Sequence, residues 1–350
     1  MPSAYVTSET VALCQRIDII DLHLDTLIPQ RLWGYNPLVR HTWKPFGRHF
    51  FFHSDVPRFV EGCLSGGMWS ITTNPLRPPQ NRWNTFLKNL TKLQNLCQTS
   101  QNQMVLARTY EEYQQGRSAE AILVLPAVQG ANAISGAPDG AFSIPDHLIT
   151  RMTLVHLTPS VYGNTSSPLH HLVSNKGLKA PGKRLIEQMN ERHIFVDLAH
   201  AHPQTFWDAV DVQKKAHPLL VTHTGVDGAR SHWRNLDDRQ IRAIADTGGV
   251  IGIMFATNFL QHSKGPKNAT MILEHLEHLI AVGGESIAAI GSDFDGAISP
   301  PRDLNNATQY PVLVQQMLDR GWKENRIASV MGGNFLRVFK EYRGTLQQIA

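Results

Sequence analysis

The sequence has little of several features that mark other classes of protein. Its 350 residues include only Cys14, Cys63 and Cys97, too few and too scattered for a disulfide framework or a thiolate zinc site. No run of about 18 apolar residues is long enough to span a membrane. Residues 1–16 lack the basic start and apolar core of a secretion signal. We therefore expect a cytoplasmic protein without a membrane partner.

Strong charge of one sign is also missing. The chain has 33 Lys and Arg against 29 Asp and Glu, a formal net charge of +4, and no run of five like charges. A nucleic-acid partner is therefore not expected. A hydrophobic fraction of 42% with 18% charged residues excludes an intrinsically disordered chain. Histidine is the unusual residue, with 17 copies spread along the sequence.

The chain repeats one order, in which a short apolar run is followed by a polar or glycine-rich stretch and then an amphipathic helix. Several runs are apolar throughout, as expected of strands buried on both faces. The runs of strand length are residues 17–25, 63–73, 121–130, 152–157, 193–200, 218–224, 249–255 and 287–295. Helical spacing of apolar residues lies between them, for example over residues 86–96, 241–245 and 272–280. This order predicts an α/β fold, a (β/α)8 TIM barrel formed by residues 1–350 as one domain.

Residues that bind metals stand where these apolar runs end. His23 and Asp25 end the first run, His200 the fifth, His223 the sixth and Asp293 the eighth. Barrel strands all end at one rim, and residues two apart on a strand face the same side, so these side chains should converge. Each alone is more often an ordinary core or loop residue. Together, imidazoles and carboxylates without thiolate favour catalytic zinc or a similar divalent ion.

Other histidine-containing segments are predicted to lie outside this metal site. The Glu-His pairs at 274–275 and 277–278 lie inside a helical pattern and are predicted to be a solvated helix face. His202 stands directly before Pro203, where the chain has left the strand, so it is not expected to be a ligand. Residues 31–57 fit no element and are predicted to form a loop beside the site.

Several longer motifs occur in a fixed order along almost the whole chain. They are Asp-Leu-His-Leu-Asp at 21–25, Asp-Val-Pro-Arg at 55–58, Val-Asp-Leu-Ala-His at 196–200, Thr-His-Thr at 222–224, Arg-Asn at 234–235, Gly-Ser-Asp-Phe-Asp-Gly at 291–296 and Met-Gly-Gly-Asn-Phe-Leu-Arg-Val-Phe at 331–339. In this order they resemble the membrane dipeptidase (renal dipeptidase) family, peptidase family M19, of the amidohydrolase-like metal-dependent hydrolases. The resemblance implies a hydrolase barrel with a binuclear zinc centre.

The resemblance also implies a set of ligands. His23, Asp25 and Asp293 match the family positions that hold one zinc ion, and His200 and His223 match those that hold the other. A zinc-activated water would then attack the amide carbon of a dipeptide.

Roles for the substrate follow from the same resemblance. His156, at the end of the fourth run, matches the residue that polarises the scissile carbonyl, and Arg234 the residue that binds the substrate's carboxylate. Asp293 would carry the proton from the water to the leaving amine. The expected substrate is a small dipeptide-like molecule with a free carboxylate. A homodimer is compatible with the sequence.

One residue departs from the family pattern. Gln129 ends the third run, where the family has a glutamate that bridges both zinc ions. A neutral amide offers one weak oxygen ligand and cannot bridge two cations. With Asp25, Asp293 and a hydroxide, two zinc ions would leave about one uncompensated positive charge. We therefore expect one or two zinc ions per chain, the second bound weakly at His200 and His223.

Three functions remain open at this point. The first is a zinc-dependent dipeptidase with one strong and one weak metal site. The second is a one-metal enzyme redirected to a tailoring reaction on a small amino-acid-derived metabolite. The third is a catalytically weakened binding protein, which the retention of His156 and Arg234 disfavours. The loops at 31–57 and 258–268 are expected to set the substrate's side-chain preference.

Overall fold

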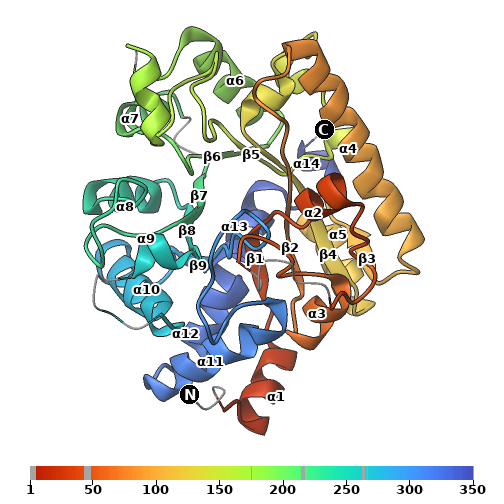
Figure 1. Ribbon diagram of the computed structural model, residues 1–350, viewed down its shortest axis with the longest axis vertical. Coiled ribbons are helices and arrows are strands. Elements are labelled where there is room, and N and C mark those ends of the chain that lie inside the picture. Colours follow the sequence, from red (N-terminus) through yellow and green to blue (C-terminus); the bar gives the residue numbers. More distant parts are fainter. Residues whose placement is uncertain are drawn as a thin grey trace.

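A closed ring of parallel strands occupies the centre of the molecule and helices surround it (Figure 1). The computed structural model describes residues 5–42, 49–174, 176–213, 217–261, 265 and 267–349. The ring consists of β1 (Ile20–Leu24), β2 (Gly66–Ile71), β4 (Ile122–Gln129), β5 (Arg151–Thr153), β6 (Phe195–Asp197), β7 (Leu219–Thr224), β8 (Val250–Ile253) and β9 (Ala288–Ile290). The strand order is β2-β1-β9-β8-β7-β6-β5-β4, and a pairing of β2 with β4 closes it. The predicted (β/α)8 TIM barrel is confirmed.

A further short strand, β3 (Met104–Leu106), was not predicted. It pairs with the first residues of β4, whereas β5 pairs with the last ones. Val124 of β4 has partners in both β2 and β3, so these two strands lie on opposite edges of β4. Because β2 and β4 pair directly, β3 extends the sheet outside the ring. Three residues are too few for the sequence pattern to reveal a strand.

Two apolar cores explain why the strands are apolar on both faces. In β4, Leu123 and Leu125 belong to the core inside the barrel, whereas Val124 and Val128 belong to the core between the strands and the helices. This alternation follows from the two-residue period of a strand. All eight positions of β4 are buried, as expected of a strand covered on both sides.

The helices lie around the ring and cover its outer face (Figure 1). In chain order they are α1 (Ser8–Arg16), α2 (Leu27–Trp33), α3 (Val56–Glu61), α4 (Pro79–Thr99), α5 (Tyr110–Ser118), α6 (Ala180–Glu191), α7 (Pro203–Val212), α8 (Asp238–Asp246), α9 (Thr257–Leu260), α10 (Thr270–Gly283), α11 (Tyr310–Asp319), α12 (Glu324–Ala328), α13 (Asn334–Tyr342) and α14 (Leu346–Ile349). The predicted helical patterns fall within α4, α8 and α10, which confirms them. Helix α8 begins with a capping box, in which Asp237 and Gln240 each accept a hydrogen bond from the other's backbone N–H.

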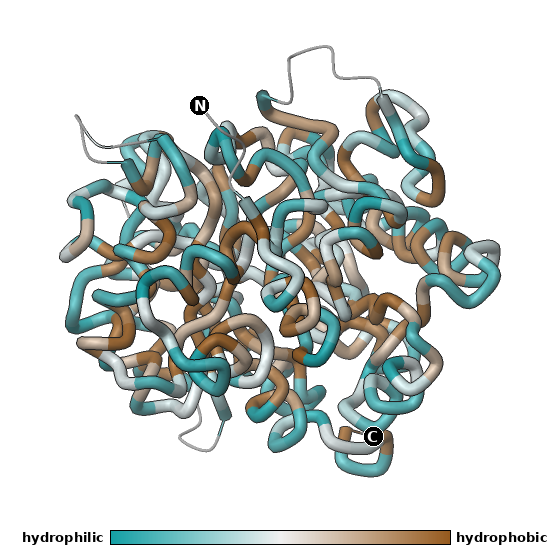
Figure 2. The backbone as a smooth tube through the Cα atoms, turned by 90° about the horizontal axis from the view of Figure 1, so that it is seen from below, coloured by the Kyte–Doolittle hydropathy of each residue, from teal (hydrophilic) through white to brown (hydrophobic). Residues whose placement is uncertain are grey.

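Hydrophobic and hydrophilic residues alternate over short distances along the backbone. Figure 2 shows hydrophobic stretches that are short and alternate with hydrophilic ones. Within the described part of the chain, none of the helices has the length and apolar character that a membrane span requires.

Two sequence expectations need correction. The segment 31–57 is not wholly a loop, because α2 continues to Trp33 and α3 begins at Val56; its residues 43–48 lie outside the described part. The predicted solvated face of α10 is wrong for His275, which is fully buried. Its Nδ1 accepts a hydrogen bond from the backbone N–H of Val226, and its Nε2 lies 3.1 Å from the carbonyl of Leu260. A ring satisfied by backbone groups can be buried next to acidic neighbours.

Arg343 lies at the face of the barrel where the strands begin, opposite their carboxyl ends. Its guanidinium is fully buried and donates to the carbonyls of Arg108, His147 and His193, at 2.7–2.8 Å. These carbonyls precede α5, β5 and β6. A single side chain therefore ties the C-terminal helices to three loops far apart in the sequence.

We expect Arg343→Met to lower the free energy of unfolding by about 3 kcal/mol or more, because it leaves three buried carbonyls without donors. Urea denaturation followed by circular dichroism measures this loss. Arg16→Met is the matched control, since the pair of Arg16 with Glu324 is exposed and worth about 0–1 kcal/mol. Equal losses in the two variants would contradict the role given to Arg343.

Candidate metal and substrate site

The predicted metal ligands and His156 lie at the carboxyl ends of the barrel strands, whereas Arg234 lies in the loop that follows β7. His23 and His223 are within β1 and β7, Gln129 is the last residue of β4, and Asp25 directly follows β1. The others lie three residues beyond a strand: His156 after β5, His200 after β6 and Asp293 after β9.

Backbone geometry turns two of these residues back over the ring. His200 has a φ of 66° and Asp293 a φ of 62°, in the left-handed region that side chains adopt rarely. Hydrogen bonds hold both turns: the carbonyl of His200 accepts from the N–H of Ser166 at 2.7 Å, and the N–H of Asp293 donates to the carbonyl of His23 at 3.1 Å. Such strained positions concentrate at functional sites.

Three buried ligand atoms from different strands come together at the centre. Potential ligand atoms of His23, His223 and Asp293 all lie within 4.8 Å of one another. His23 Nε2 is 3.7 Å from Asp293 Oδ1 and 3.5 Å from Asp25 Oδ2. Imidazole nitrogens and carboxylate oxygens in this arrangement suit one divalent ion such as zinc. His223 thus lies with the predicted ligands of the first ion as well as with His200.

The remaining imidazoles line one side of this centre. His200 Nε2 and His223 Nε2 are 2.8 Å apart, and the rings of His156 and His200 meet edge to face at 4.7 Å. Burial lowers the pKa of His200 and of His223 well below the usual value, with Arg234 and other histidines adding to the effect. Burial also lowers the pKa of His156 to about 4. At neutral pH these rings are therefore uncharged, as metal-binding imidazoles must be.

The Gln129 amide lies between the Asp25 carboxylate and the rings of His23 and His156. With its amide nitrogen toward Asp25, that nitrogen is 3.2 and 3.1 Å from the two carboxylate oxygens. Its oxygen is then 3.2 Å from His156 Nε2 and 3.1 Å from His23 Nε2. A carboxylate could not donate to Asp25, so this set of contacts is specific to the amide. The residues present fit one ion but provide no bridging anion for a second.

Opposite charges face each other across the centre. Burial raises the pKa of Asp293 well above its usual value, and the neighbouring Asp25 raises it further. Arg234 is buried, and its Nη2 donates to the carbonyl of His223 at 2.8 Å. Burial lowers the pKa of Arg234 to about 10, so the guanidinium stays charged at neutral pH. It provides a buried cation beside the ligand cluster.

Sequence reasoning missed Arg151, a fully buried residue at the start of β5 whose guanidinium contacts His23. The signal was a charged residue directly before the apolar run at 152–157. His202, in contrast, is outside the site as expected: it caps the N-terminus of α7 and accepts from the N–H of Gln204. Of the predicted specificity loop 258–268, residues 262–264 and 266 lie outside the described part.

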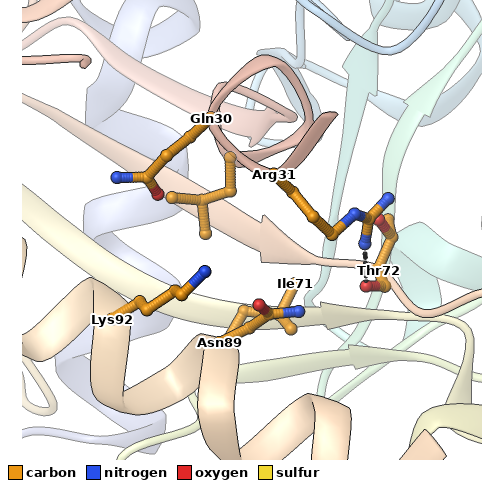
Figure 3. A pocket seen from close by; sticks show the side chains of 7 residues that line it. Gln30, Arg31, Ile71, Thr72, Asn89 and Lys92 are labelled. Atoms are coloured by element: carbon orange, nitrogen blue, oxygen red, sulfur yellow. Dashed lines mark hydrogen bonds between the residues drawn. The ribbon is translucent and has the colours of Figure 1, made fainter. Parts of the chain in front are cut away.

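Space for a small ligand lies beside His156. A cavity of about 220 Å³ is lined by His156, Arg31, Thr72, Asn132 and Thr158 among others. A second cavity of about 270 Å³ shares Asn132 and Thr158 with it. Figure 3 shows an adjoining pocket lined by residues of α2, β2 and α4, where the Arg31 guanidinium donates to the carbonyl of Thr72. Arg31 therefore lines both the pocket in Figure 3 and the cavity beside His156.

Known proteins resemble this chain in sequence and in fold. An uncharacterized dipeptidase of Schizosaccharomyces pombe is 31% identical over 216 residues, which cover 61% of this chain and 51% of the relative. Dipeptidase 3 of Macaca fascicularis is 23% identical over 338 residues, covering 95% of this chain and 67% of that protein. The chain therefore spans about half of the first relative and about two thirds of the second.

Among solved structures, a metallopeptidase from Rhodobacter sphaeroides has a TM-score of 0.79 at 23% identity, covering 93% of this chain and 99% of that one. That structure holds a phosphinate mimic of the dipeptide L-Ala-D-Ala. The likeness supports the fold. The model of the family described as membrane dipeptidase matches residues 7–349, and the chain therefore belongs to peptidase family M19.

Proposed function

We propose that this protein is a zinc-dependent dipeptidase-type hydrolase, which cleaves the amide bond of dipeptides or small amino-acid conjugates carrying a free carboxylate. The observation that carries the proposal is the ligand cluster of His23, His223 and Asp293 next to the buried cation Arg234. Membership of peptidase family M19 supports it. The dipeptide mimic held by the Rhodobacter sphaeroides relative supports the substrate class.

The donor set indicates what the metal would contact. His23, Asp25, His200, His223 and Asp293 are the proposed ligands. A divalent ion bound by such a set lowers the pKa of water and stabilises negative charge on oxygen. Zinc suits two or more imidazoles with carboxylates, and the described site contains no thiolate.

The chain's own residues would orient the substrate and move its protons. His156 is neutral, and its Nε2–H now faces the Gln129 oxygen, so a substrate carbonyl can take that hydrogen bond instead. Arg234 would form a forked pair with the carboxylate of the leaving amino acid. Asp293 would accept a proton from the attacking water and return it to the amine.

The two other functions are less favoured. A weakened binding protein would have no need to keep both His156 and Arg234 beside the ligand cluster, and the dipeptidase family and relatives favour hydrolysis over a redirected tailoring reaction. Only Gln129 favours these two functions, and the effect of this residue on metal binding and activity can be measured directly.

Metal removal tests the proposal as a whole. We expect the zinc-loaded protein to hydrolyse unmodified dipeptides and the chelated protein to lose this activity, with recovery on adding zinc. Amino-acid release measured by mass spectrometry is the assay. Absence of hydrolysis over a broad dipeptide set with zinc, cobalt or manganese would refute the dipeptidase function.

Arg234→Met should lower kcat/KM for free dipeptides by a factor of about 30 to 1,000, because the forked pair is worth about 2–4 kcal/mol in the transition state. The same change should have little effect on dipeptide amides, which lack the carboxylate. Arg230→Met, in the same loop, is the matched control. Equal turnover of free and amidated dipeptides by the unaltered enzyme would assign Arg234 another role.

Gln129→Glu should tighten zinc binding and raise dipeptide hydrolysis at least tenfold, because it adds an anionic ligand at almost the same volume. Calorimetric zinc titration and steady-state kinetics measure the two effects. Gln129→Asn, which stays neutral, should show neither gain. If the carboxylate lowers activity instead, the amide itself takes part in the reaction and the tailoring function becomes the better proposal.

A further inference from the structure

Two adjoining cavities lead away from His156. The cavity beside His156 and the second cavity have Pro75, Asn132 and Thr158 in common, so they lie next to each other. Their volumes are about 220 and 270 Å³, whereas a water molecule takes about 30 Å³ in the liquid. Each cavity therefore has room for a substrate side chain of several atoms.

The charged side chains that line this space are cationic. Arg31 lines the cavity beside His156, and Arg82 and Lys179 line the second cavity. Among the described residues that line either cavity there is no aspartate and no glutamate. A cleft lined by charge of one sign concentrates its electric field and attracts a ligand of the opposite sign.

These cations have no acidic partner within the part of the chain that the structure describes. The ion pairs of its arginines and lysines all involve other residues, such as Arg58 with Asp55. A single unpaired surface cation is ordinary. Three of them on one continuous space next to His156 indicate that the space is built for an anion.

Neutral oxygen atoms hold the two cations of the second cavity. Lys179 Nζ donates to the carbonyl of Ser160 at 2.7 Å, which leaves two of its three hydrogens for a ligand. Arg82 Nε donates to the carbonyl of Asn132 at 2.9 Å, and its Nη2 donates to the hydroxyl of Ser135 at 2.6 Å. Arg82 thus has a structural role in the loop after β4, whereas the single contact of Lys179 does not account for its position.

The position of Arg234 indicates which part of a dipeptide reaches this space. Arg234 follows β7 and lines neither cavity, and in the proposed function it binds the carboxylate of the leaving amino acid. The cavities are lined by residues that follow β2, β4 and β5. With the scissile carbonyl at His156, the amino-terminal residue of the dipeptide therefore extends into them.

We propose that Arg31 and Lys179 are specificity-determining residues, which make the enzyme prefer dipeptides with an acidic amino-terminal residue. The side-chain carboxylate of that residue lies in the joined cavities, where the two cations bind it and Arg82 adds positive charge. The same cations disfavour a basic side chain by repulsion. The inference rests on the proposed function for the direction in which the dipeptide binds.

The dipeptides Glu-Ala and Gln-Ala test the proposal, because they have nearly the same shape and differ by one charge. With the zinc-loaded protein at neutral pH, kcat/KM for Glu-Ala should exceed that for Gln-Ala about tenfold, since hydrogen bonds to a carboxylate are stronger than those to an amide. Lys-Ala should be the poorest of the three substrates. In the double variant Arg31→Gln, Lys179→Gln, the ratio of Glu-Ala to Gln-Ala should fall to about one.

Lys183→Gln is the matched control. Lys183 is exposed on α6, one helical turn after Lys179, and lines neither cavity. This variant should keep the substrate ratio of the natural protein. If the double variant does not fold, salt provides a second measurement on the natural protein, because screening should lower the preference for Glu-Ala.

Equal kcat/KM for Glu-Ala and Gln-Ala would overturn the proposal while leaving the dipeptidase function intact. A preference that persists in the folded double variant, or one that salt does not weaken, would also overturn it. If neither dipeptide is cleaved, the dipeptidase function fails, and calorimetric titration of the zinc-loaded protein with both dipeptides tests the cationic cavities alone. Tighter binding of Glu-Ala would then support the proposal, and equal binding would overturn it.

Discussion

A buried carboxylate, Asp197, is the group on which the geometry of the site depends. It is the last residue of β6, and it accepts hydrogen bonds from Thr153 of β5, from the hydroxyl and N–H of Thr222 in β7, and from the N–H of Ala199. These bonds compensate the cost of burying its charge. They also fix three neighbouring strand ends and the turn that leads to His200. Because Thr222 in turn contacts His223 Nδ1, the carboxylate orients the imidazole that faces the metal centre.

Asp21 has the same role for the ends of strands β1 and β9. Its carboxylate accepts from the N–H of His23 at 3.0 Å, from the N–H of Ser292 at 2.9 Å and from the hydroxyl of Tyr310 at 2.5 Å. Strand β1, the turn after β9 and helix α11 therefore meet at one acceptor. Asp293 follows directly after Ser292, so its left-handed turn starts from a fixed point. Both halves of the site are thus supported by a buried carboxylate one layer below the ligands.

The sequence was sufficient for the barrel because parallel strands buried on both faces are apolar throughout, and because strand ends carry the polar residues. It was insufficient where tertiary contacts override the pattern. β3 is too short to show periodicity, and His275 is buried because two backbone groups satisfy its ring. Arg151 was missed because a charged residue argues against a buried strand, so the predicted run began one residue later. The tertiary structure alone supplies the acceptors that allow its burial.

Arg151 changes the interpretation of Gln129. The sequence shows only that Gln129 lacks the negative charge of the glutamate that the family has at this position. In the structure, Gln129 and Arg151 lie at opposite nitrogens of the same His23 ring. The Gln129 oxygen lies 3.1 Å from His23 Nε2 while its amide nitrogen can donate to Asp25, and the Arg151 guanidinium lies 3.0 Å from His23 Nδ1. A glutamate at 129 would face Asp25 with a like charge and without a donor. The departure at 129 is therefore accompanied by a rearranged hydrogen-bond network, in addition to the loss of a bridging ligand.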